Sequence, residues 1–116
     1  MGGIMTIVTD TSTLDGLRER LTRFVADRQW ESFHTPKNLA MALAGEVGEL
    51  LAEFQWLTPE ESAAVVTADP EAAARIRSEL ADVTTYLVHL AMALDVDLVA
   101  NAHHKLDEVE VRYPPL

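Results

Sequence analysis

Two pairs of acidic residues stand out in the sequence because both pairs have the same spacing. Glu46 and Glu49 are three residues apart, and so are Glu79 and Asp82. In a helix this spacing places both side chains on one face, with Cβ atoms about 5–6 Å apart. Each pair can therefore share one cation, and two such pairs brought together would form a site for a divalent metal ion.

The segments that carry these pairs are largely apolar, and no Lys or Arg stands directly beside either pair. Burying an ionised carboxylate is costly unless a cation or a hydrogen-bond partner replaces its water. Carboxylate oxygens favour hard cations, so Mg²⁺ is the expected cofactor, with Mn²⁺ as the alternative and zinc disfavoured. Gly48, within the first pair, either admits a close approach or serves helix packing. The spacing by itself also fits solvated acids on helix surfaces.

Capping signals predict an all-α fold and indicate where the helices begin. Thr35-Pro36 and Asp69-Pro70 each combine an N-cap residue with proline at the first helical position. Ser12 or Thr13, the Thr58 capping box and Asp97 mark the other starts. The predicted helices cover about residues 13–29, 36–55, a short stretch from 59, 70–94 and 98–112. We expect a bundle of four to five helices, centred on those bearing Glu46 and Glu79 and assembled as an oligomer.

The composition predicts one domain, residues 13–116, preceded by a flexible segment, residues 1–12. The chain has no cysteine and no apolar run of about 20 residues, so we expect a cytoplasmic protein that does not enter a membrane. Its net charge of −10 argues against a nucleic-acid polymer as partner. A small polyanionic substrate remains compatible if divalent cations separate its phosphates from the acids.

Further motifs extend along nearly the whole chain. WESFHTPKNL covers residues 30–39, GEVGEL covers 45–50, FQW covers 54–56, and Lys105 is followed by the ending Arg112-Tyr113-Pro114. Together with the two acidic pairs, these motifs resemble the all-α MazG-like nucleotide pyrophosphohydrolases, and in particular their dCTP pyrophosphatase-like branch. The resemblance covers about residues 14–114.

The resemblance implies Mg²⁺-dependent hydrolysis of a (deoxy)nucleoside triphosphate to the monophosphate and pyrophosphate. The expected substrates are dCTP or related pyrimidine or modified deoxynucleotides. All four acids are the expected metal ligands and catalytic residues, with Glu49 as the candidate acceptor of the proton from water and Glu53 as an extra candidate ligand. The resemblance also implies a homo-oligomer, with a tetramer favoured over a dimer. In it, a neighbouring chain would donate Trp30 or Lys105 to the site.

The same resemblance suggests residues that bind the nucleotide, each with a structural alternative. Trp30 and Trp56 would stack on the base or simply pack, while His34 and Asn38 would bind polar groups or only bond within their loop. Tyr86 would contact the nucleotide or only pack, and Lys105 and Arg112 would contact the phosphates or remain solvated at the surface.

Two positions depart from the family pattern, since Leu21 replaces a histidine and Val109 an asparagine, which leaves base and sugar preference open. The alternatives are a phosphoribosyl-ATP pyrophosphatase-like or dUTPase-like hydrolase, or a non-catalytic helical module that binds a metal and a partner.

Overall fold

The computed structural model describes residues 10–116, which contain α-helices and one short 3₁₀-helix but no strand, so the all-α prediction is confirmed. The predicted flexible segment, residues 1–12, lies mostly outside this range. The elements, in chain order, are α1 (Leu14–Asp27), η1 (Glu31–Phe33), α2 (Pro36–Ala52), α3 (Pro59–Ala68), α4 (Pro70–Ala93) and α5 (Leu98–Arg112).

The capping residues start the helices as the sequence predicts. In each case a side-chain oxygen accepts a hydrogen bond from a backbone N–H in the first turn, which satisfies a donor that has no partner inside the helix. Thr58 and Glu61 form a reciprocal capping box. The other caps are Thr13 for α1, Thr35 for α2, Asp69 for α4 and Asp97 for α5.

Two predicted helix ends were too late. The helix α1 ends at Asp27 instead of Gln29, because Gln29 has a φ of 56°, in the left-handed region that ends a helix. The helix α2 ends at Ala52 instead of Gln55, and the chain then continues through turns before α3. No glycine or proline marks either end, so neither end has a local signal in the sequence.

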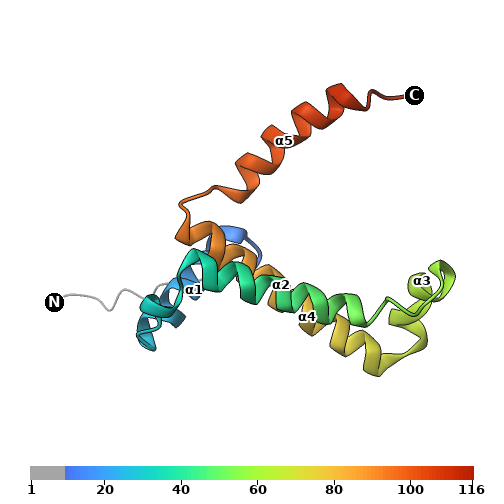
Figure 1. The fold of residues 1–116 in the computed structure, drawn as a ribbon, viewed down its shortest axis with the longest axis horizontal. Helices are drawn as coiled ribbons and strands as arrows, with labels where there is room; N and C mark the ends of the chain where they lie inside the picture. Colours follow the sequence, from blue (N-terminus) through green and yellow to red (C-terminus); the bar gives the residue numbers. More distant parts are fainter. Residues whose placement is uncertain (1–9) are drawn as a thin grey trace.

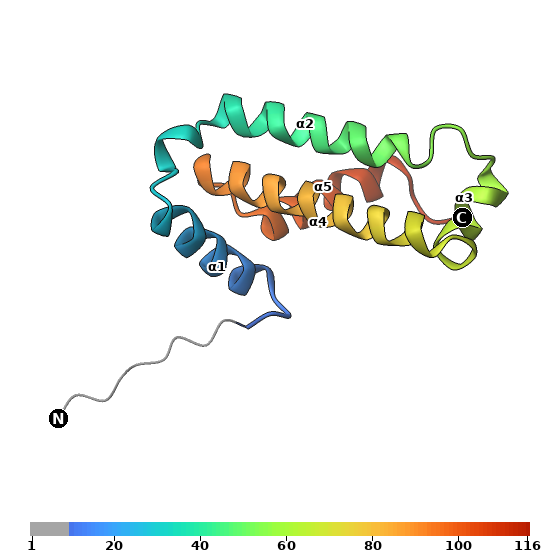
Figure 2. The ribbon, with the colours of Figure 1, turned by 90° about the horizontal axis from the view of Figure 1, so that it is seen from below.

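Helices α2 and α4 lie side by side and antiparallel at the centre of the fold (Figure 2). The chain returns through α3, which packs against α4, and α1 packs against the other end of α4. The pairs that face each other or line a common cavity along α2 and α4 are Leu39 with His89, Ala42 with Tyr86, Glu46 with Glu79, and Glu53 with Arg75.

Helix α5 extends away from the other helices (Figure 1). Asp95, with a φ of 53°, ends α4, and the axes of α4 and α5 differ by 94°. The radius of gyration is 18.2 Å, whereas a compact chain of this length has one of about 13 Å. Because α5 packs along no other helix of residues 10–116, its apolar side chains face solvent, including Val99 and Leu106.

The core of the single chain is small. Within residues 10–116 the buried apolar side chains are Val25, Leu39, Ala72, Ala73, Ile76, Val88 and Ala91. Larger apolar residues on the outer side of α2 remain exposed, among them Met41 and Leu51, and nothing lies within 4 Å of the Cβ positions of Gly45 and Gly48. One chain therefore leaves an extended apolar surface in water.

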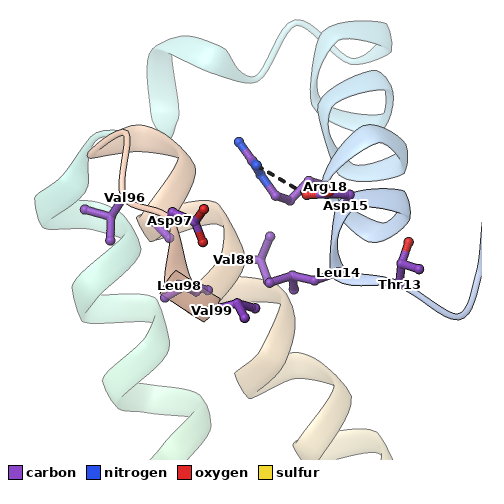
Figure 3. A pocket seen from close by; sticks show the side chains of 10 residues that line it. Thr13, Leu14, Asp15, Arg18, Val88, Val96, Asp97, Leu98 and Val99 are labelled. Carbon is purple, nitrogen blue, oxygen red and sulfur yellow. Dashed lines mark ion pairs between the residues drawn. The ribbon is translucent and has the colours of Figure 1, made fainter. Parts of the chain in front are cut away.

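A cavity of about 260 Å³ lies where α1, the end of α4 and the start of α5 meet (Figure 3). Its polar lining includes an exposed ion pair between Arg18 and Asp15 at 3.6 Å, but none of the site residues predicted from the sequence. Among the described helices, none alone has the length and apolar composition to cross a membrane. Only the sharply bent pair α4 and α5 meets those criteria when both helices are counted together.

Candidate functional site

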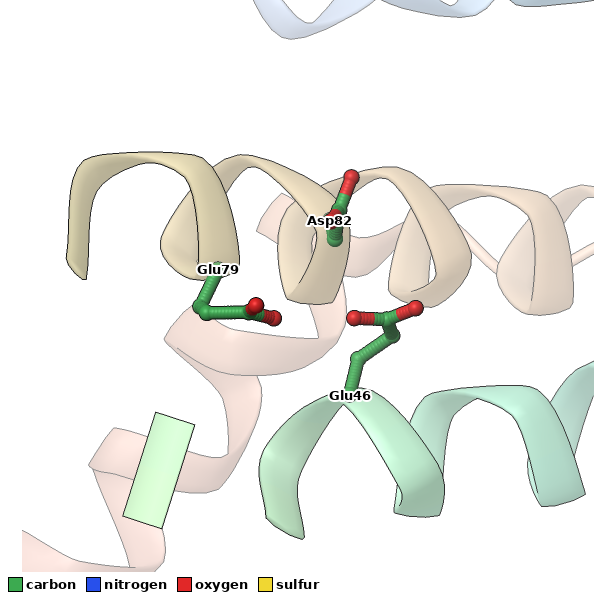
Figure 4. Close-up of side chains that lie close together, drawn as sticks. All are labelled: Glu46, Glu79 and Asp82. Atoms are coloured by element: carbon green, nitrogen blue, oxygen red, sulfur yellow. The ribbon is translucent and has the colours of Figure 1, made fainter. Parts of the chain in front are cut away.

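Three of the four predicted acids converge between α2 and α4. Glu46 extends from α2 toward Glu79 and Asp82 of α4 (Figure 4), and one carboxylate oxygen from each residue lies within 4.8 Å of the others. Glu49 lies beside this three-acid cluster rather than within it, and its carboxylate interacts with those of Glu46 and Glu79. The antiparallel packing of the two helices is what joins the two acidic pairs.

The three-acid cluster fits the oxygen ligands that a hard divalent cation requires. Glu46 and Glu79 are only partly exposed, and the Oε2 atom of each is buried without a hydrogen-bond partner in the described chain. Buried oxygens without a partner are unfavourable, because nothing replaces the water that they lose. A bound cation would remove this penalty and the repulsion between the acids together.

The surroundings of these acids shift their protonation toward the neutral form. Burial raises the pKa of Glu79 to about 7, and the carboxyl groups of Glu46 and Glu49 beside it act in the same direction. Burial also raises the pKa of Glu46, and the charges of Glu49 and Asp82 act in the same direction. Without metal, the cluster therefore holds a proton near neutral pH, and binding a cation must displace that proton.

The stability of the metal-free protein should depend on this proton. Unfolded Glu79 ionises near its ordinary pKa of 4.5, but folded Glu79 does so only near 7. Between these values the folded state binds more protons, so Glu79 stabilises the fold at low pH and this contribution is lost as the pH rises through 7. In EDTA, we expect the melting temperature of the parent, relative to a Glu46→Gln/Glu79→Gln variant, to fall between about pH 5 and about pH 8.

The comparison with the double variant removes the effect of other titrating groups. Buried His89 is the main one, because burial lowers its pKa and its effect on stability runs in the opposite direction. Millimolar Mg²⁺ should raise the melting temperature of the parent most at the upper end of the pH range and leave the double variant unchanged. Equal stabilisation of both proteins by Mg²⁺ would mean that the cation binds elsewhere.

A pocket with aromatic walls lies next to the three-acid cluster. It encloses about 340 Å³ and is lined by Trp30, Phe33, His34, Asn38, Leu39, Ala42 and Tyr86. Ala42 precedes Glu46 by four residues and Tyr86 follows Asp82 by four, so the pocket begins one helical turn, about 6 Å, from the acids. We call this cavity the aromatic pocket. It unites four of the residues that the sequence suggested for nucleotide binding.

Two features missed by the sequence analysis shape the aromatic pocket. The short helix η1 was not predicted, and it sets the positions of Trp30 before it and His34 after it. His89 is buried, and its ring meets the ring of His34 edge-on, with the two ring centroids 4.7 Å apart. Both histidines also line a separate cavity of about 270 Å³. The signal that could have revealed His89 is one histidine within the apolar run of residues 87–94.

Other predicted residues lie outside this arrangement. Trp56 is 86% exposed in the turn after α2. Lys105 and Arg112 are on α5, which extends away from α2, and the Nζ of Lys105 donates a hydrogen bond to Glu108 at 3.0 Å. A single chain therefore does not bring these three side chains to the acids.

Glu53, the extra candidate ligand, is engaged by a cation of the protein itself. The guanidinium of Arg75 donates two hydrogen bonds to its carboxylate, from Nε at 2.8 Å and from Nη2 at 3.2 Å. This paired geometry ties the end of α2 to α4 one turn beyond Glu49. No local sequence pattern points to Arg75 as the partner of Glu53, because the two residues lie 22 positions apart along the chain.

Comparison with known proteins supports one family. The chain is 43% identical over 102 residues to dCTP pyrophosphatase 1 of Bos taurus, covering 88% of this chain and 60% of that protein. It is 45% identical to the Homo sapiens dCTP pyrophosphatase 1 over the same length, covering 59% of that protein. The chain thus spans about three fifths of the length of these curated relatives. No model of a known protein family matches the sequence.

A solved structure resembles this chain in fold and in sequence over its full length. The crystal structure of a pyrophosphatase from Archaeoglobus fulgidus superposes with a TM-score of 0.81 at 31% sequence identity, covering 95% of this chain and 100% of that one. An identity of this level over a complete chain indicates common descent as well as a common fold. The chain therefore belongs to the all-α MazG-like nucleotide pyrophosphohydrolases, and it is similar to dCTP pyrophosphatase 1 over most of its own length.

Proposed function

We propose that this chain hydrolyses a (deoxy)nucleoside triphosphate, dCTP or a related pyrimidine or modified deoxynucleotide, to the monophosphate and pyrophosphate. The observation that carries the proposal is the position of the aromatic pocket, one helical turn from the three-acid cluster on the same two helices. A nucleotide with its base in the pocket would extend its phosphates toward the acids. The similarity to dCTP pyrophosphatase 1 supports the same substrate class.

In this proposal Glu46, Glu49, Glu79 and Asp82 hold Mg²⁺, with Mn²⁺ as the alternative. The bound ion would offset the charge of the triphosphate and lower the pKa of a water molecule that attacks it. Glu49 is exposed and lies beside the other acids, which makes it the candidate to accept the proton of that water. Glu53 is paired with Arg75, so its proposed role is to hold α2 in register with α4.

The residues of the aromatic pocket would hold the base. Trp30, in the segment before η1, and Tyr86, on α4, supply aromatic surfaces on which a planar base can stack. The edge-on contact with buried His89 limits the movement of His34, so this wall is preorganised. Leu21 and Val109, where the family pattern has histidine and asparagine, remove two polar groups, and the selectivity must come from the residues that remain.

We also propose that the chain forms a homo-oligomer, with a tetramer favoured over a dimer. The exposed apolar surfaces of α2 and α5 are the reason, because association would remove them from water. Within one chain, Lys105, Arg112 and Trp56 do not reach the acids. In such an assembly these side chains would reach the acids of a neighbouring chain, and Trp30 could likewise act across the interface. We place residues 13–116 in one catalytic domain and the protein in the cytoplasm.

A panel of nucleotides tests this function directly. We expect Mg²⁺-dependent release of pyrophosphate and monophosphate in equal amounts, with dCTP and 5-substituted dCTP as better substrates than purine nucleotides. Mn²⁺ should support the same products. Turnover of only dUTP or only phosphoribosyl-ATP would favour the corresponding related hydrolase. No turnover of any nucleotide, with Mg²⁺ still bound, would favour a non-catalytic metal-binding module.

A further inference from the structure

Asn38 is held in one orientation at the edge of the aromatic pocket. It occupies the first turn of α2, where its backbone N–H donates a hydrogen bond to the Thr35 Oγ1 at 3.3 Å. Its side-chain Nδ2 donates a second hydrogen bond to the backbone carbonyl of Phe33 at 3.1 Å. A carbonyl oxygen only accepts hydrogen bonds, so the nitrogen end of the amide must face Phe33. The backbone and the amide plane of Asn38 are both fixed.

This orientation determines what Asn38 offers to a ligand. Because the nitrogen is held beside the Phe33 carbonyl, the end of the amide away from that carbonyl is the acceptor Oδ1. Within the described chain, no hydrogen bond to Oδ1 is formed, while Asn38 lines the aromatic pocket with Trp30 and Tyr86. Turning the amide over would place Oδ1 against the Phe33 carbonyl and lose a hydrogen bond.

We propose that the Oδ1 of Asn38 accepts a hydrogen bond from the exocyclic amine of the base. This contact would select bases that carry an amino group over bases that carry a keto group at the same position. This inference rests on the proposed function of the aromatic pocket as the base site. Aromatic walls stack on any base and cannot separate cytosine from uracil, which have the same shape. An oriented acceptor can, because an amine donates a hydrogen bond to it and a keto oxygen repels it. Cytosine fits the pocket as the smaller of the amino-bearing bases.

The expected effect is moderate, because Asn38 is exposed to solvent in the free protein. One hydrogen bond between neutral groups in such a place changes selectivity by about tenfold. We therefore expect Asn38→Ala to lower kcat/KM for dCTP about tenfold and to raise kcat/KM for dUTP slightly, because the repulsion of its keto oxygen is removed. The triphosphate of 2-pyrimidinone deoxyriboside, which lacks the exocyclic group, should be hydrolysed equally by parent and variant.

Asn101 provides a matched control. Its Nδ2 donates a hydrogen bond to the Asp97 carbonyl at 2.7 Å in the first turn of α5, away from the aromatic pocket. Asn101→Ala removes a similar bond at a similar place in a helix and should leave the ratio of dCTP to dUTP turnover unchanged. The melting temperatures of both variants, with and without Mg²⁺, show whether either substitution disturbs folding or the acids.

Binding measurements separate this inference from the proposed hydrolysis. The affinities of dCMP and dUMP, followed by tryptophan fluorescence, should show the same loss of preference in Asn38→Ala even if no hydrolysis occurs. If hydrolysis is observed but Asn38→Ala lowers kcat/KM for dCTP and dUTP by the same factor, the Asn38 side chain only supports the loop before α2 through its hydrogen bond to Phe33, and the inference is wrong. An unchanged dCTP preference in the variant would also overturn it.

Discussion

Asp82→Asn and Glu49→Gln are each expected to slow pyrophosphate release from dCTP by about a thousandfold or more, while helical content and oligomer size stay the same. Each substitution keeps the size of the side chain but removes a negative charge. Asp82 contributes an oxygen to the three-acid cluster, and Glu49 interacts with Glu79 at its edge. The measurement is single-turnover release of pyrophosphate at saturating Mg²⁺.

Glu19→Gln is the control for this experiment. Glu19 is an exposed acid on α1, so its substitution changes the net charge by the same amount without touching the acids between α2 and α4. It should keep the parent activity. The Asp82→Asn and Glu49→Gln variants should also differ in their metal dependence. Asp82→Asn is expected to need more Mg²⁺ for activity, whereas Glu49→Gln should keep more of its affinity for Mg²⁺ and lose mainly kcat. Parent-like turnover in both would contradict the proposed roles.

On the proposal of a homo-oligomer, Leu106→Glu is expected to prevent assembly and to abolish activity with it. Leu106 lies on the apolar side of α5, with Val99 and Leu87 around a shallow apolar cavity of about 360 Å³. A charge in the centre of the apolar surface that the proposed oligomer would cover prevents close packing, because the charge would lose its water without gaining a partner. An isolated helix of 15 residues is barely stable in water, so α5 should also lose helical content.

Light scattering, circular dichroism and pyrophosphate release together test this prediction. Ala100→Glu is the control: Ala100 is exposed on the opposite side of α5, with His104 and Asp107 one and two turns further on. It introduces the same charge and should leave assembly and activity unchanged. If Leu106→Glu remains an active oligomer, the interface does not include this side of α5. If it becomes monomeric but stays active, no residue from a neighbouring chain is required.

Local chemistry explains how much of the fold followed from the sequence. The helix starts at Thr35, Thr58, Asp69 and Asp97 were correct, because a cap and its first turn involve only a few neighbouring residues. The end of α1 was not, because Gln29 adopts its positive φ without a glycine to indicate it. Within each acidic pair, the three-residue spacing also placed both carboxylates on one helix face before any tertiary structure was known.

The helix starts, the acid pairs and the family resemblance could all be predicted from the sequence, since each depends on residue type and short-range spacing. How the helices meet could not be predicted in this way. The antiparallel register of α2 and α4 places Glu46 against Glu79, and it also pairs Glu53 with Arg75. Burial at that contact raises the pKa of Glu79 to about 7. Contacts between residues far apart in the chain depend on packing that no local pattern encodes, and the position of α5 is another such result.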